Sequence, residues 1–208
     1  MLRFLIADDH AIVRKGLKQI LLEEYPTAEI GEAGDAESLA NKCTQELWDV
    51  VISDLNMPGR SGLDALKQIK QTCPQLPVLI MSMYPEDQYA LRVLKSGASG
   101  YLSKERIHDE LIPAVQTVLN GRKFITSSIA EILAESLETK PGQIHELLSN
   151  REFDVLKLIA SGKSVSEIAE QLSLSVTTVS TYRARILEKL KMRSNADLTR
   201  YALEKNLI

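Results

Sequence analysis

Three carboxylates, one hydroxyl and one amine in this chain each follow a short run of strand-forming residues. They are Asp8, Asp9, Asp54, Ser82 and Lys104. Neighbouring carboxylates raise each other's pKa unless a cation lies between them, and Mg²⁺ prefers such oxygen ligands. An aspartate can also accept a phosphoryl group covalently, while a metal ion and a lysine neutralise the transferred charge. These residue types together point to metal-assisted phosphoryl chemistry.

Parallel strands would bring these five residues to one place. Continuous apolar runs, typical of strands buried on both faces, cover residues 4–7, 50–53 and 78–81. Alternating or mixed patterns that suit sheet edges cover residues 28–33 and 100–103. Helical patterns lie between and after them, at residues 12–21, 36–44, 63–69, 87–96 and 111–119. Five alternating units predict a doubly wound, five-stranded parallel α/β sheet that binds ligands at the carboxyl ends of its strands.

Composition limits the class of protein. The chain has 208 residues, 44% of them hydrophobic and 25% charged, as is ordinary for a globular protein. No apolar run approaches the roughly 18 residues that span a bilayer, so we expect a cytoplasmic protein without a membrane partner. Cys43 and Cys73 lack metal-ligand spacing and are expected to be reduced structural thiols.

The last 61 residues differ from the rest in charge and pattern. From residue 148 onward there are 10 Lys and Arg against 7 Asp and Glu, a net charge of +3, although the whole chain carries −3. Ser149 with Glu152 and Ser164 with Glu167 fit capping boxes at two helix starts, and Ser175 fits the N-cap of a third. A tight turn at 173–174 before a basic helix predicts a helix-turn-helix that binds double-stranded DNA.

The third helix of this part has a predicted core side and a predicted DNA side. Val179, Ile186 and Leu190 share the core side at 100° per residue. The opposite side, expected to read bases, carries Thr177, Thr181, Ala184 and Arg185; Thr181 can offer a hydroxyl or a methyl group, and Arg185 can bind guanine with two hydrogen bonds. Residues expected to hold phosphates are Thr178, Arg183, Lys189 and Lys191, and Ser180 completes the predicted DNA-binding set.

The final helix is predicted at residues 195–205. Leu198, Tyr201 and Ala202 form an apolar stripe along it. A three-helix unit needs only part of such a stripe, so we predict that it also forms the contact of a homodimer on DNA. The two-fold symmetry of a dimer would call for paired half-sites.

Two family resemblances cover nearly the whole chain. Residues 1–120 resemble a response-regulator receiver domain, through Asp8-Asp9, the run 54–59, Ser82 and the run 97–104. Residues 148–208 resemble the LuxR-type DNA-binding domain, through the segments 151–152, 155–156, 162, 167–169, 172, 175, 178–179 and 189–190. In this order the two are similar to the NarL/FixJ family, which implies a flavodoxin-like strand order of 2-1-3-4-5.

The resemblance implies roles for individual residues. Asp54 would accept a phosphoryl group from a sensor histidine kinase, and Lys104 would pair with that group. Mg²⁺ would be bound by Asp9, Asp54 and the main-chain carbonyl of Asn56, with Asp8 assisting through water. Ser82 and Tyr101 would form the switch pair that reports phosphorylation. In many relatives a proline after the lysine supports a cis peptide, whereas Glu105 follows Lys104 here.

The expected organisation is a receiver at 1–120, a linker with a short helix at 121–147, and a DNA-binding domain at 148–208. Ser128 with Glu131 is a possible capping box for the linker helix. The predicted function is phosphorylation-dependent transcriptional regulation rather than enzymatic turnover. One alternative is a magnesium-dependent phosphatase with Asp54 as nucleophile, which would need an acid where Asn56 stands. Another is a receiver controlled by a ligand or partner instead of phosphate.

Overall fold

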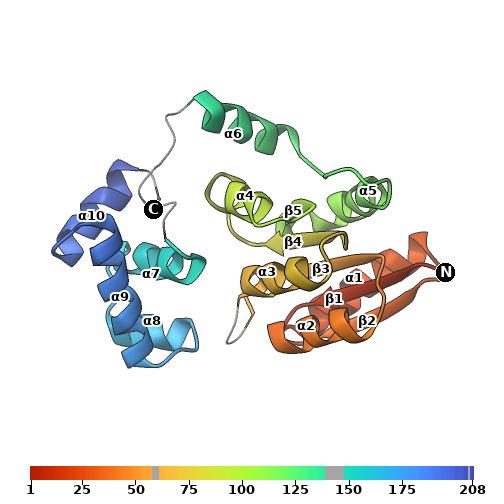
Figure 1. The fold of residues 1–208 in the computed structure, drawn as a ribbon, viewed down its shortest axis with the longest axis horizontal. Coiled ribbons are helices and arrows are strands. Elements are labelled where there is room, and N and C mark those ends of the chain that lie inside the picture. The colour runs from red at the N-terminus through yellow and green to blue at the C-terminus, as the bar shows by residue number, and fades with distance from the viewer. Residues whose placement is uncertain (58–60, 139–147, 206) are drawn as a thin grey trace. The chain divides into compact units, whose positions relative to one another are not determined.

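The chain is divided into two compact units. The computed structural model describes residues 1–57, 61–138, 148–205 and 207–208 (Figure 1). One unit covers Met1–Glu138 and the other Thr139–Ile208. The last two residues of the run 54–59 and the part of the predicted linker at 139–147 lie outside the described residues.

Five parallel strands form the sheet of the first unit in the predicted order β2-β1-β3-β4-β5. Their bounds are β1 (Arg3–Ala7), β2 (Glu29–Ala33), β3 (Val50–Asp54), β4 (Val78–Ser82) and β5 (Gly100–Ser103). The strands β3 and β4 are buried throughout because apolar side chains are covered on both faces, whereas β2 at one edge is mostly half-buried. Ala7 pairs with Ser53, and Asp54 pairs with Met81. The carboxyl ends of β1, β3 and β4 therefore lie at one edge.

Helices cover both faces of this sheet (Figure 1). They are α1 (Ala11–Glu24), α2 (Ala36–Gln45), α3 (Gly62–Thr72), α4 (Glu86–Lys95) and α5 (Ile107–Leu119). Leu17 and Leu21 of α1 join a core cluster with α5 and the sheet. The apolar stripe predicted at 12–21 is wrong at its start, because Ile12 is 77% exposed.

The segment after α5 remains attached to the first unit. Phe124 forms a parallel bridge to β5. The helix α6 (Ser127–Glu138) then packs against α4, and its Ile129 is fully buried. Thr126 caps this helix, since its hydroxyl oxygen accepts the N–H of Ile129 at 3.3 Å. The capping box predicted at Ser128 is therefore wrong, because the helix begins at Ser127, two residues earlier than a cap at Ser128 would place it.

The second unit consists of helices in its described part. They are α7 (Asn150–Ala160), α8 (Val165–Gln171), α9 (Val176–Leu190) and α10 (Asn195–Glu204). The capping boxes predicted at Ser149 and Ser164 are confirmed, and Ser175 caps α9 by accepting the N–H of Thr178 at 3.0 Å. Ser173, in the turn between α8 and α9, has a left-handed φ of 53°. Apolar side chains of all four helices form the core.

Two predictions made from composition concern membrane-spanning helices and the two cysteines. None of the helices among the described residues is long and apolar enough to cross a membrane. Cys43 and Cys73 are both free thiols, as predicted, and Cys43 is buried between α2 and α3.

Candidate functional site

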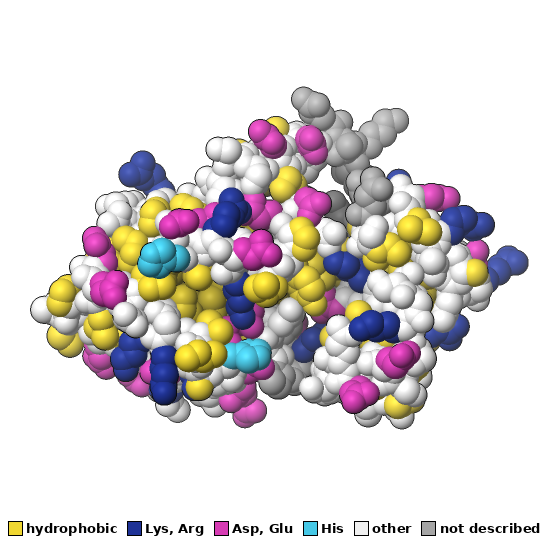
Figure 2. Space-filling model, turned by 180° about the vertical axis from the view of Figure 1, so that it is seen from behind, with side chains coloured by type: hydrophobic (Ala, Val, Ile, Leu, Met, Phe, Trp, Pro, Cys, Tyr) yellow, Lys and Arg dark blue, Asp and Glu magenta, His cyan; other side chains and the backbone are white. Residues whose placement is uncertain are grey.

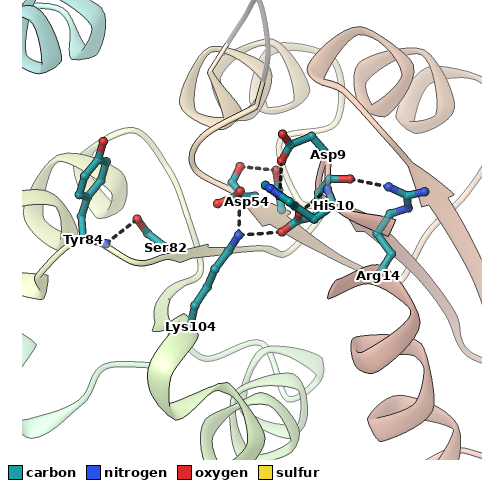
Figure 3. Close-up of polar contacts among 9 residues, drawn as sticks. Asp9, His10, Arg14, Asp54, Ser82, Tyr84 and Lys104 are labelled. Atoms are coloured by element: carbon teal, nitrogen blue, oxygen red, sulfur yellow. Dashed lines mark hydrogen bonds and ion pairs between the residues drawn. The ribbon is translucent and has the colours of Figure 1, made fainter. Parts of the chain in front are cut away.

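A cluster of charged side chains around Asp8, Asp54 and Lys104, named the acidic pocket, lies at the carboxyl edge of the sheet (Figure 3). Asp8 follows β1, Asp54 ends β3, and Lys104 begins the short 3₁₀ helix η1 (Lys104–Arg106) after β5. The Lys104 ammonium group donates to Asp8 Oδ2 and to Asp54 Oδ2, each at 2.8 Å. Both carboxylates are almost fully buried. The parallel sheet thus places one cation between two carboxylates that are 46 residues apart in the chain.

Burial and pairing have opposite effects on the groups in this pocket. Burial raises the pKa of Asp54, and the bond from Lys104 only partly offsets that increase. Burial alone would lower the pKa of Lys104, but its bonds to Asp54 and Asp8 raise it above the usual value. Lys104 therefore remains charged at neutral pH, while the ionised form of Asp54 is held at a free-energy cost. A carboxylate in this state favours an additional positive charge nearby.

Asp9 is the more accessible neighbour of Asp8. Asp9 Oδ1 lies 2.8 Å from His10 Nδ1, and its side chain is 28% exposed. The ligand atoms of Asp8, Asp9 and His10 lie within 4.8 Å of one another. Both carboxylate oxygens of Asp8 are occupied, one by Lys104 and the other by the main-chain N–H of His10 at 2.8 Å. The accessible carboxylate of Asp9 lies next to Asp8, which shares Lys104 with Asp54, and it is the kind of oxygen ligand that a hard divalent cation prefers.

Arg14 is a functional residue that sequence reasoning missed. Its Nη1 donates to the main-chain oxygen of Asp8 at 2.8 Å, and its Nε pairs with Glu32 at 3.1 Å. The β1–α1 turn is thereby held from α1 and from β2 together. The sequence pattern indicated this contact only weakly, because an arginine near the start of a helix usually faces solvent.

Ser82 and Tyr101 meet at the backbone of Tyr84. Ser82 Oγ accepts the Tyr84 N–H at 3.0 Å, and the Tyr101 hydroxyl donates to the Tyr84 carbonyl at 2.7 Å. Both side chains are fully buried, and burial raises the pKa of Tyr101 to about 12. The Tyr84 ring stacks on Tyr89 of α4 at 4.6 Å. A shift of Ser82 would therefore reach Tyr101 and α4 through one residue.

Gly62 contacts the main chain of the central aspartate. Its N–H donates to the Leu55 carbonyl at 2.9 Å. A Cβ atom on Gly62 would lie 1.9 Å from the Asp54 carbonyl oxygen, which no side chain can tolerate. Glycine at this position lets α3 begin directly against the end of β3.

The peptide bond after Lys104 is trans, as are all peptide bonds among the described residues. Ser103 Oγ accepts the Glu105 N–H at 3.3 Å and caps η1. The capped turn therefore presents Lys104 to the pocket without the proline found in many relatives.

The exposed side of α9 forms a second candidate site. Val179, Ile186 and Leu190 are buried, as predicted. Members of the predicted DNA-binding set that are exposed are Thr177, Ser180, Thr181, Ala184, Arg185, Lys189 and Lys191, whereas Thr178 and Arg183 are half-buried. The helix thus presents a continuous surface opposite its core side.

Two basic residues of α9 are engaged inside the second unit. Arg183 Nε donates to Asn195 Oδ1 of α10 at 2.6 Å. Lys189 Nζ pairs at 2.6 Å with Glu152, a buried carboxylate of α7. Burial alone would raise the pKa of Glu152, but the bonds from Lys189 and Ser149 bring it below the usual value. The structure therefore gives both side chains a packing role, which sequence spacing did not predict.

The predicted dimer stripe of α10 is not on the surface. Leu198 and Ala202 are fully buried and Tyr201 is 8% exposed, because α10 packs with these residues against α7. The expectation that the helical core needs only part of this stripe is therefore wrong, and the dimer contact itself stays a prediction. Leu203 is the large apolar residue that α10 leaves exposed.

Comparisons with known proteins cover both units. Family models for the response regulator receiver domain and for the LuxR family of bacterial regulatory proteins match residues 4–116 and 146–202. The oxygen regulatory protein NreC of Staphylococcus carnosus (strain TM300) is 37% identical over 215 residues, which span all of this chain and 99% of the relative. The response regulator UvrY of Escherichia coli (strain K12) is 34% identical over 210 residues, all of this chain and 96% of UvrY. A solved complex of the response regulator RcsB with DNA is similar with a TM-score of 0.59, 30% identity and 96% of each chain covered.

Proposed function

Because this chain belongs to the NarL/FixJ family of two-component response regulators, we propose that phosphoryl transfer to Asp54 controls the binding of promoter DNA by the second unit. The observation that carries the proposal is the pairing of buried Asp54 with Lys104 beside two further carboxylates. A phosphorylated histidine of a sensor kinase is the natural donor in this family.

The transfer step uses groups already in place. A carboxylate oxygen of Asp54 attacks the phosphorus, the phosphorus–nitrogen bond to the donor histidine breaks, and an acyl phosphate forms. Lys104, 2.8 Å from Asp54, pairs with a phosphoryl oxygen as charge moves onto the aspartate. Asp9, Asp54 and the main-chain carbonyl of Asn56 would hold Mg²⁺, which supplies further charge neutralisation when bound. Arg14 and the main-chain N–H of His10 hold Asp8 in position.

The phosphoryl group also offers new acceptor oxygens to Ser82. Its hydroxyl oxygen accepts the N–H of Tyr84. Donation to a phosphoryl oxygen would draw Ser82 toward Asp54 and shift Tyr84, whose carbonyl binds Tyr101. We assign the switch to this Ser82–Tyr84–Tyr101 connection, which biases two states of the receiver.

Labelling of the purified chain with acetyl phosphate and Mg²⁺ tests the phosphoacceptor. Asp54→Asn is expected to abolish acid-stable, base-labile labelling, because the amide cannot form an acyl phosphate. Asp35→Asn is the matched control, because Asp35 caps α2 away from the pocket and asparagine caps equally well. Equal labelling of wild type and Asp54→Asn would refute the proposal.

The second unit supplies the output. RcsB, a similar protein, has been solved in complex with DNA, and the exposed side of α9 is the surface that we propose for DNA binding here. We propose binding as a homodimer to paired half-sites, with a cytoplasmic location. Leu198, Tyr201 and Ala202, predicted to form the dimer contact, are buried within one copy of this unit.

No turnover of an external substrate is proposed. A phosphatase with an aspartate nucleophile needs a proton donor near the leaving group, and the amide of Asn56 cannot donate in that way. The chain is expected to release no phosphate beyond one equivalent from a phosphomonoester with Mg²⁺. Repeated turnover would support the phosphatase instead.

A further inference from the structure

The exposed side of α9 carries several methyl groups. Thr177, Thr181 and Ala184 lie at positions i, i+4 and i+7, on one face, and all three are exposed. Sequence alone left open whether Thr181 presents its hydroxyl or its methyl group to a base. The structure distinguishes these two possibilities.

The hydroxyl of Thr181 is engaged with its own helix. Thr181 Oγ1 donates to the carbonyl oxygen of Thr177, one turn earlier, at 3.0 Å. This is the back-bond that threonine makes in helices, and it occupies the single hydroxyl proton. Donation to a base would require breaking that bond, whereas the methyl group has no polar partner to give up. The methyl group is therefore the part of Thr181 suited to contact a base edge.

The cations of α9 point to the same conclusion. The Arg183 guanidinium group is bound to Asn195 and the Lys189 ammonium group to Glu152, so both groups already have a partner. Among the described residues, Arg185 makes no hydrogen bond or ion pair. On the face of the molecule that Figure 2 shows, Lys and Arg side chains are interspersed with Asp and Glu. Within α9 itself, Arg185 is therefore the cation best placed to read a base.

We infer that Thr181 and Ala184 select thymine through its methyl group, so that the half-site contains thymine beside the base read by Arg185. Alanine and threonine methyl groups make apolar contact with the thymine methyl in the major groove. The two residues are three apart and thus adjacent on the helix surface. This inference rests on the proposed binding of DNA by the second unit, and it names the chemical feature of the DNA that is recognised.

The experiment begins with selection of bound sequences from random duplex DNA by the full-length chain, treated with acetyl phosphate and Mg²⁺. Each thymine of the selected half-site is then replaced by deoxyuridine, which lacks only the methyl group. We expect replacement of one or two thymines to raise Kd about fourfold each, the effect of exposing one buried methyl group. Unchanged Kd at every thymine would overturn the inference. Failure to select any sequence over random DNA would instead refute the proposed function.

Two variants separate the methyl group from the hydroxyl. Thr181→Val keeps a methyl group and removes the hydroxyl, and it should retain both affinity and sensitivity to deoxyuridine. Thr181→Ser keeps the hydroxyl and removes the methyl group; its Kd should rise about fourfold on the thymine site and show no further loss on the deoxyuridine site. Loss of affinity in Thr181→Val with none in Thr181→Ser would show reading by the hydroxyl and overturn the inference. Affinity for random DNA at the same salt is the control for folding.

Discussion

The acidic pocket of the first unit and the exposed side of α9 are built on opposite principles. In the pocket, Asp8 and Asp54 are nearly inaccessible and share one cation, and further donors hold the turn that carries Asp8. On α9 the residues expected to meet DNA are exposed, and Arg185 has no partner within the part of the chain that the structure describes. The charged groups of the pocket are already paired within the protein, whereas Arg185 on α9 is expected to gain a partner only when DNA binds.

This difference shows what each site must do. A buried set of charges in a medium of low dielectric responds strongly when one more charge is added, as a switch requires. A surface that meets DNA in water gains much of its affinity from cations that contact phosphates, whereas its choice of sequence depends on methyl contacts and a few directed hydrogen bonds. Substitutions should therefore change stability in the pocket and change binding on α9.

The largest effect is expected for Lys104→Met. Removing the shared cation leaves two buried carboxylates without their partner and should lower the free energy of unfolding of the first unit by about 3 kcal/mol. Trp48 is the single tryptophan of the chain and lies in the first unit, so its fluorescence during urea unfolding reports this unit.

Lys15→Met is the control for Lys104→Met, because Lys15 is exposed on α1 and should change stability by less than about 0.5 kcal/mol. Mg²⁺ should restore more stability to Lys104→Met than to wild type, since the ion replaces the missing charge. Equal stability of the two variants would mean that the pocket is not electrostatically coupled.

Arg185→Ala is the corresponding substitution on α9. Loss of two hydrogen bonds to guanine should cost about 2 kcal/mol of binding, roughly 30-fold in Kd for the selected site, with no change in stability. Fluorescence anisotropy at fixed salt measures the effect on selected and random duplexes. An equal loss on both duplexes would instead assign Arg185 to the phosphate backbone.

A smaller effect, dependent on pH, is expected for Glu152→Gln. Glutamine preserves the capping box but not the charge that binds Lys189, so the second unit should lose about 1.5 kcal/mol at neutral pH. The pKa of Glu152 is lowered in the folded unit, so its stabilisation is present above the ordinary glutamate pKa and disappears as pH falls through the lowered value. The penalty should therefore be full above the ordinary glutamate pKa of about 4.3 and vanish only below the lowered pKa of Glu152, as measured by circular-dichroism unfolding curves.

Asp54→Asn is expected to raise the free energy of unfolding in metal-free buffer, which is the opposite of the effect of Glu152→Gln. Because burial raises the pKa of Asp54, its ionised form costs stability above the ordinary aspartate pKa of about 4. The variant should be more stable than wild type at neutral pH, and the difference should disappear in acid. If Asp54→Asn and Glu152→Gln both lowered the free energy of unfolding at neutral pH, the contrast between the two units would not hold.

The smallest effect distinguishes two lysines near the end of α9. Lys189→Gln should leave the salt dependence of DNA binding unchanged, because this ammonium group is paired with Glu152. Lys191→Gln should reduce the slope of log Kd against log salt by about 1, as expected for one phosphate contact. Equal slopes for the two variants would show that both lysines contact DNA or that neither does.

The sequence by itself determined the strands, most of the helix starts and the meeting of Asp54 with Lys104. Apolar periods and capping boxes such as Ser149 with Glu152 involve residues a few positions apart, so their physics is readable locally. The pocket was predictable because parallel strands bring their carboxyl ends to one edge, whatever the separation along the chain.

Only the tertiary structure decided which side chains already have a partner within the protein. Lys189 is bound to Glu152 and Arg183 to Asn195. The apolar stripe around Tyr201 packs against α7. Arg14 reaches the carbonyl of Asp8, and Thr126 rather than Ser128 caps α6. The physical reason is that helix patterns specify which face a residue occupies, whereas the partner that meets this face depends on how helices distant in sequence pack together.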